Sequence, residues 1–242
     1  MSELATIFYM KRCDKGSNKH FYHTVYEKEL ENFRNSSSFK LLEVGVLEGA
    51  GIASWLEYFP NARKIVGLDL FDRVSQEDVA VLSNPKVQSI KADSTKVVLS
   101  EHLSPVTEKF DVIIDDGMHS PKANRETFVN LIPYLKKTGT YFIEDVWPLD
   151  VMTKRELNHR WIRTHQDRFN DVEYSEFLDA LKNYDVQRFD LRRISGHPDS
   201  YIFKVKHKKS APNESPRNND QEQSFIPESV PEPTGIQQES QE

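Results

Sequence analysis

The sequence has 242 residues, of which 37% are hydrophobic and 29% are charged, a size near the upper limit for one hydrophobic core. Residues 207–242, with seven acidic and three basic side chains, hold −4 of the net charge of −6. The nearly neutral remainder argues against a surface for nucleic acid or for a membrane. The single cysteine, Cys13, excludes an internal disulfide, and the N-terminus lacks the apolar core of a signal peptide, so a cytoplasmic protein is expected.

Residues 1–39 are a polar lead-in with one predicted helix, at about 22–33. From residue 40 on, short apolar runs alternate with segments whose apolar side chains recur at helical spacing. The predicted strands are 40–46, 64–70, 87–91, 110–115 and 140–144. The predicted helices are 51–59, 77–82, 96–103 and 122–135. This alternation predicts an α/β domain over residues 40–206 with a Rossmann-like, doubly wound, mostly parallel sheet.

The pattern changes after residue 151. A long helical stretch is predicted over 153–182, followed by strands at 185–193 and 200–206 around a turn at 195–198. These two strands are expected to form an antiparallel hairpin at one edge, which completes a seven-stranded sheet. Residues 207–242 contain five prolines and few apolar side chains, too few to offset the entropy cost of ordering. They are predicted to be a disordered, acidic, proline-rich tail.

Small and acidic residues follow the first three predicted strands, at the edge where doubly wound sheets bind ligands. The first strand leads into Glu43, Gly45 and Gly49, and the glycines allow a tight turn and close approach of a ligand. Asp69 ends the second strand, where an acid can accept hydrogen bonds from both hydroxyls of a ribose, and Asp93 follows the third. Together they favour an adenosine-bearing cofactor. The alternatives are a plain strand-to-helix turn and solvated or helix-capping acids.

The fourth and fifth strands end in a denser set of acids. Asp116 follows the fourth strand, and Glu144 and Asp145 close the fifth. Neighbouring parallel strands lie about 4.8 Å apart, so these carboxylates should meet and repel one another unless a cation or protons neutralise them. An all-oxygen set suits Mg²⁺ or Mn²⁺, and His119 would stand beside it, able to take a proton from a bound hydroxyl. The alternative is an acidic rim with a structural histidine.

Four segments together resemble one family. They are D-K-G-S-x-x-H-x-Y-x-x-x-Y-E at 14–27, the glycine-containing stretch at 41–69, IIDDGMH at 113–119 and YFIED at 141–145. This combination is similar to the class I methyltransferases that use S-adenosylmethionine (SAM), in particular the metal-dependent sugar O-methyltransferases of macrolide biosynthesis. The resemblance spans about residues 11–147. Met118 departs from it, because relatives usually have serine there.

The resemblance implies a cofactor-binding set from the lead-in, which would cover the cofactor, and from the strand ends. Its members are Lys15, Gly16, His20, Tyr22, Glu43, Gly45, Gly49, Asp69, Leu70, Asp93, Ser94 and Asp115. It also implies a metal site for Mg²⁺ or Mn²⁺ made of Asp116, Glu144 and Asp145. His119 would be the general base.

These observations predict a SAM-dependent, metal-assisted O-methyltransferase for a hydroxyl of a small molecule, either a sugar or a glycosylated natural product. A catechol-like phenol is the alternative acceptor, because it also offers two adjacent oxygens to a metal. A catalytically silent cofactor-binding protein is the alternative of another class. No nucleic-acid or membrane partner is expected, and assembly into a homo-oligomer is left open.

Overall fold

The computed structural model describes residues 1–96, 101–103 and 108–209. Met1–Lys208 form one compact unit, so the lead-in and the sheet share a core. Residues 210–242 of the predicted tail and residues 97–100, half of the predicted helix at 96–103, lie outside the described residues. Among the described residues, no helix combines the length and the apolar character needed to cross a bilayer.

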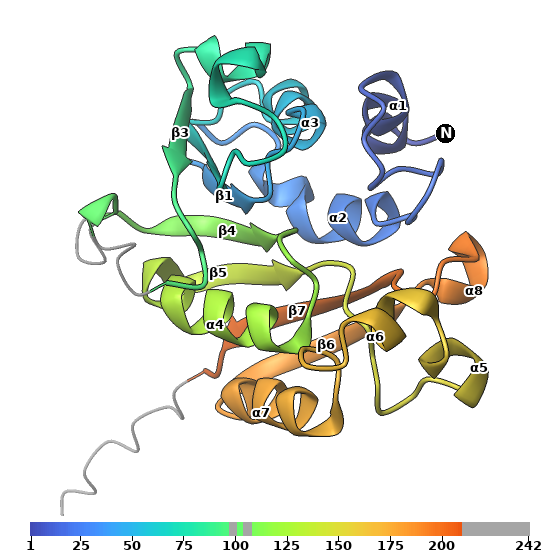
Figure 1. Cartoon of the computed structure of the whole chain (residues 1–242). Helices are drawn as coiled ribbons and strands as arrows, with labels where there is room; N and C mark the ends of the chain where they lie inside the picture. The colour runs from blue at the N-terminus through green and yellow to red at the C-terminus, as the bar shows by residue number, and fades with distance from the viewer. Residues whose placement is uncertain (97–100, 104–107, 210–242) are drawn as a thin grey trace, which may run out of the picture. The chain divides into compact units, whose positions relative to one another are not determined.

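A seven-stranded sheet is the centre of the compact unit (Figure 1), and its order is β3-β2-β1-β4-β5-β7-β6. Five strands are parallel, as predicted: β1 (Lys40–Val44), β2 (Lys64–Asp69), β3 (Val87–Lys91), β4 (Phe110–Asp115) and β5 (Leu135–Ile143). The order reverses between β1 and β4, which is the switch point where such sheets bind ligands. The predicted hairpin is confirmed: β7 (Tyr201–His207) runs antiparallel to β5 and to the edge strand β6 (Tyr184–Asp190).

Helices cover both faces of the sheet (Figure 1). One face packs against α1 (Glu3–Met10), α2 (His23–Leu30) and α3 (Ala50–Tyr58), with Trp55 and Phe142 in the shared core. The other packs against α4 (Pro121–Leu131) and α7 (Asp171–Leu181), around Phe128 and Phe177. Both sides of the strands are therefore buried, which explains why their sequences are apolar without alternation. The remaining short turns are 3₁₀ helices at Glu31–Phe33, Gln76–Asp78, Ala80–Ser83 and Ile132–Tyr134.

The structure corrects two predicted helices. Residues 77–82 form two 3₁₀ turns because the backbone leaves helical geometry at Val79, where ψ is 87°. Pro85 favours the extended conformation of Asn84, which ends the second turn. The long helix predicted over 153–182 is three separate helices, α5 (Lys154–Leu157), α6 (Arg160–Thr164) and α7, followed later by α8 (Arg192–Ser195). Each of the three begins at a residue whose side chain accepts a backbone N–H of the new helix: Thr153, His159 and Asn170.

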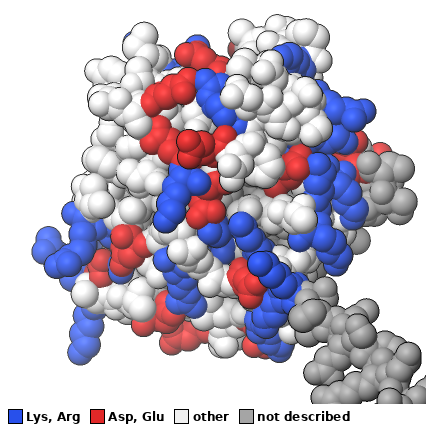
Figure 2. Space-filling view, turned by 180° about the vertical axis from the view of Figure 1, so that it is seen from behind, with Lys and Arg blue, Asp and Glu red and all other residues white. Residues whose placement is uncertain are grey.

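The charged side chains of the surface are intermixed. On the face shown in Figure 2, basic and acidic residues lie side by side over the described part of the chain. This distribution agrees with the small net charge expected for the residues that precede the tail.

Candidate active site

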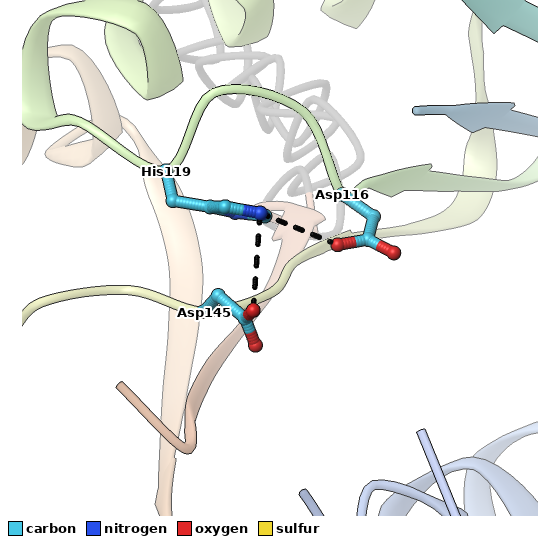
Figure 3. Close-up of side chains that lie close together, drawn as sticks. All are labelled: Asp116, His119 and Asp145. Atoms are coloured by element: carbon cyan, nitrogen blue, oxygen red, sulfur yellow. Dashed lines mark ion pairs between the residues drawn. The ribbon is translucent and has the colours of Figure 1, made fainter. Parts of the chain in front are cut away.

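The ends of β4 and β5 bring three potential metal ligands together (Figure 3). One ligand atom each from Asp116, His119 and Asp145 lie within 4.8 Å of one another. The His119 Nε2 atom is 3.6 Å from Asp116 Oδ1 and 3.8 Å from Asp145 Oδ2. Asp145 is buried, whereas Asp116 and His119 are partly exposed, so the group is open to solvent on one side.

The backbone is strained where the strands end. Among the described residues, six other than glycine have a positive φ, and four of them lie just beyond β1, β2, β4 and β5: Leu47, Phe71, His119 and Asp145. Residues other than glycine rarely adopt a positive φ, and such backbone strain persists only where the surrounding structure imposes it. These four strained residues therefore lie at the same edge of the sheet as the candidate site. The strained backbone also sets the directions in which the side chains of His119 and Asp145 leave the chain.

The third predicted metal ligand, Glu144, lies outside this group. Its Oε2 accepts a hydrogen bond of 2.9 Å from Lys15 Nζ, and its Oε1 accepts one from the hydroxyl of Tyr26. The Lys15 ammonium also pairs with Asp116 and lies 3.4 Å from Glu43. Lys15 is one of the residues predicted to bind the cofactor. In the structure its fully buried ammonium lies among the carboxylates of Glu43 in β1, Asp116 after β4 and Glu144 after β5.

Two tyrosines of the lead-in hold the acids from the other side. The Tyr22 hydroxyl donates to Asp145 Oδ1 at 2.6 Å and accepts the Asp145 backbone N–H at 3.1 Å. Tyr26, four residues later on the same face of the lead-in, holds Glu144. Tyr26 was not among the residues predicted to have a role. Its spacing of four residues from Tyr22 was the signal that could have revealed its position beside the acids.

The glycine turn after β1 is closed by Asp69. The Asp69 carboxylate accepts the backbone N–H groups of Val46 (2.6 Å), Leu47 (3.0 Å) and Phe71 (2.8 Å). Gly45 has a φ of 85°, and a Cβ there would come within 2.0 Å of the Asp116 carbonyl oxygen. Only glycine lets the first turn lie this close to the end of β4. The turn therefore brings the backbone of the predicted cofactor loop against the metal-ligand group.

The residues predicted to bind adenine make local contacts. Asp93 accepts the Thr95 N–H at 3.0 Å and pairs with Lys96, and the Ser94 hydroxyl lies 2.9 Å from that of Thr127. These two contacts of Asp93 are local, as expected for the solvated or helix-capping acid that was the alternative to an adenine ligand. Asp115 is buried at the end of β4, where its Oδ1 accepts the Gly117 N–H at 3.3 Å.

Three large apolar side chains are exposed beside this edge. Leu47 after β1, Leu70 after β2 and Met118 after β4 have exposed fractions of 50%, 44% and 50%. The strands that precede them are neighbours in the sheet. A pocket of about 320 Å³ lies next to Met118 and is also lined by Thr95 and Ser120. Of the three, only Met118 lines this pocket. Exposed apolar side chains that follow neighbouring strands indicate a surface that a ligand covers.

Burial raises the pKa of Glu43, Asp115 and Asp145 to about 7. In the unfolded chain these acids titrate near pH 4, so the folded protein binds more protons between about pH 4 and 7. Their contribution to stability is complete below pH 4 and is lost as the pH rises through 7. His20 acts in the opposite direction below pH 6.5, because burial lowers its pKa to about 3.

We therefore expect the metal-free protein to become less stable as the pH rises from about 4 to 7.5, because the three acids outweigh the single opposing histidine. At its steepest, each acid contributes about 1.4 kcal/mol per pH unit to the fall in unfolding free energy. Urea unfolding in the presence of a chelator measures this change, and Mg²⁺ should reverse part of it at pH 8. A stability that is constant or rises over this interval would contradict the raised pKa values.

The residues present fit a divalent cation. Two carboxylates and an imidazole converge, and Asp116 and His119 leave the group accessible. Carboxylate ligands suit Mg²⁺ and Mn²⁺, and the imidazole adds preference for Mn²⁺ if it ligates. The Lys15 ammonium already compensates part of the negative charge, so one divalent cation is enough to neutralise the rest.

Comparison with known proteins agrees with this arrangement. No protein-family model matches the chain. Its fold is similar to that of a methyltransferase of known structure: the MycE methyltransferase of the mycinamycin biosynthetic pathway, solved in complex with Mg and SAH, superposes with a TM-score of 0.62. That match has 20% identity and covers 85% of this chain and 54% of the other.

Two curated relatives are sugar O-methyltransferases of antibiotic pathways. The mycinamicin VI 2''-O-methyltransferase of Micromonospora griseorubida is 26% identical over 61% of this chain. The L-olivosyl-oleandolide 3-O-methyltransferase of Streptomyces antibioticus is 31% identical over 56% of it. In each case the match covers 36% of the relative's length. The resemblance predicted from the sequence is thus confirmed.

Proposed function

We propose that this chain is a SAM-dependent, divalent-metal-assisted O-methyltransferase that modifies a hydroxyl of a small molecule, a sugar or a glycosylated natural product. The observation that carries the proposal is the convergence of Asp116, His119 and Asp145 beside the glycine turn after β1. A cation site and a candidate base would then lie next to the edge where a nucleoside cofactor would bind. The curated relatives, named as O-methyltransferases, support the same reaction.

The cofactor would lie across the ends of β1, β2 and β4. Its adenosine would cover the exposed side chains of Leu47, Leu70 and Met118, beside the ribose-binding Asp69. The pocket lined by Thr95 and Met118 would receive the adenine. Asp69 Oδ1 retains a lone pair for a ribose hydroxyl, because it accepts only the Phe71 N–H, whereas Oδ2 already accepts the N–H groups of Val46 and Leu47. When bound, SAM supplies a methyl group already activated by its sulfonium.

The protein's own residues would bind and deprotonate the acceptor. Asp116 and Asp145 would hold the cation, which lowers the pKa of a hydroxyl bound to it. His119 Nε2 faces the same point and would take the hydroxyl proton. Lys15 and Tyr26 fix Glu144, and Tyr22 fixes Asp145, so the acids stay in place before the acceptor arrives.

A second pocket offers a place for the rest of the acceptor. It measures about 480 Å³ and lies between α5 and the connection that follows α8, with Arg155, His159 and His197 in its lining. The His197 ring is 5.5 Å from that of His20, which in turn faces Asp145. Trp147, which follows β5, is buried against Phe169 and so is not free to stack on an acceptor. The acceptor would therefore approach past the polar residues of this pocket.

Calorimetry and a transfer assay test the proposal. We expect binding of SAM and of its demethylated product SAH, and Mg²⁺- or Mn²⁺-dependent transfer of the methyl group to sugars in a panel of glycosides and catechols. Transfer only to catechols would change the acceptor class. Cofactor binding without any transfer would favour a silent binding protein, and failure to bind either SAM or SAH would contradict the proposal as a whole.

A further inference from the structure

A buried histidine outside the metal-ligand group faces Asp145 from the lead-in. His20 is 1% exposed, and its ring stacks on that of Tyr22 with a centroid separation of 5.1 Å. Its Nε2 has no hydrogen-bond partner among the described residues and lies 3.5 Å from Asp145 Oδ2 and 3.9 Å from Asp14 Oδ2. The same oxygen lies 3.8 Å from His119 Nε2. Asp145 therefore lies between two imidazoles, one buried and one partly exposed.

The other ring nitrogen of His20 is fixed by a residue that is far away in the sequence. His20 Nδ1 lies 2.7 Å from the hydroxyl of Ser200, which is fully buried. If the hydroxyl donates to Nδ1, the ring proton resides on Nε2 and points to the Asp145 carboxylate. The opposite arrangement would direct the Nε2 lone pair at a carboxylate oxygen, which is electrostatically unfavourable. The favourable arrangement thus runs from Ser200 through His20 to Asp145.

The segment before β7 holds Ser200 in place. The Ser200 carbonyl accepts the Leu191 N–H at 2.9 Å, and its own N–H donates to the His197 carbonyl at 3.3 Å. The hydroxyl of Tyr22 lies 3.2 Å from the carbonyl of Asp199. The connection between β6 and β7 therefore contacts both lead-in residues that contact Asp145.

We propose that His20, fixed by Ser200, is a positioning residue that directs Asp145 Oδ2 toward the cation. This inference rests on the proposed function for the presence of the cation. Carboxylates that ligate metals are commonly oriented by a neighbouring polar side chain, and loss of such a neighbour typically weakens metal binding by about 10–100-fold. The roles are divided: Tyr22 holds Oδ1 of Asp145, and His20 directs Oδ2.

Mn²⁺ affinity, measured by electron paramagnetic resonance on the full chain, tests the proposal without requiring turnover. We expect His20→Leu and Ser200→Ala to weaken Mn²⁺ binding by about 10-fold or more. His20→Gln keeps an N–H donor near the position of Nε2 and should recover most of the affinity. His23→Leu is the matched control, because the His23 ring packs beside Phe21 and should leave Mn²⁺ binding unaltered.

The outcomes separate this inference from the proposed function. If the wild type binds Mn²⁺ and both His20→Leu and Ser200→Ala bind it equally well, the positioning role is overturned and the proposed function stands. If the wild type binds no Mn²⁺, both are overturned. If the variants weaken binding but no acceptor is methylated by the wild type, the positioning role stands and the proposed reaction does not. Ser200→Ala removes one oxygen only, so it provides a test even where His20→Leu fails to fold.

Discussion

A His119→Ala variant is expected to keep its affinity for SAH and for Mn²⁺ while methyl transfer falls by about 10²–10⁴-fold, the usual contribution of a positioned base. The reason is the location of Nε2, which faces both Asp116 and Asp145 at the accessible side of the group. This nitrogen would be the nearest basic group of the site to a hydroxyl bound by the cation. Rapid-quench measurement of a single turnover separates the methyl-transfer step from product release.

The same variant distinguishes a base from a ligand. The His119 imidazole lies close enough to both acids to share a cation with them. A loss of Mn²⁺ affinity in His119→Ala would therefore show that the imidazole ligates the cation, and it would contradict the assignment of His119 as the base. Undiminished methyl transfer would contradict it as well. His102→Ala, at an exposed position ahead of β4, is the control and should behave as the wild type.

Lys15→Met is expected to lower the free energy of unfolding by about 3–5 kcal/mol at pH 8 in the absence of metal, the range found when one partner of a buried ion pair is removed. Lys15 is fully buried, and its ammonium pairs with Asp116 and Glu144 and approaches Glu43. These neighbours raise the pKa of Lys15 even though burial alone would lower it. Methionine fills much of the same volume but leaves the acids without compensation.

Divalent cations should partly reverse this destabilisation. Without the ammonium, the acids repel one another and bind a cation more tightly, so Mn²⁺ affinity should rise as the stability of the metal-free protein falls. Chemical unfolding with and without Mn²⁺ measures both effects. Lys11→Met is the matched control, because Lys11 pairs with Glu57 in solvent and should contribute at most about 1 kcal/mol. Equal stabilities of the two variants would show that Lys15 does not compensate the buried acids.

The parallel strands were predictable because each is a short apolar run with a distinct polar ending. The predicted 110–115 coincides with β4, and 87–91 with β3. The helices were less predictable. A helical pattern of apolar residues extends over 153–182, but side-chain caps at His159 and Asn170 begin new helices within it. Local hydrogen bonds of this kind override periodicity. α1 was not predicted, although its buried Leu4, Ile7 and Phe8 recur at helical spacing.

The sequence by itself determined the kind of site: the order of strands places Asp116, His119 and Asp145 at one edge, and the motif spacing fixes which residue types are available there. Only the tertiary structure decided how these residues pair. Lys15, His20, Tyr22 and Tyr26 come from a lead-in that crosses the carboxyl ends of the strands, and Ser200 comes from the far end of the chain. Hydrogen bonds between residues more than one hundred positions apart leave no local trace in a sequence, because their partners are set by how the lead-in packs on the sheet.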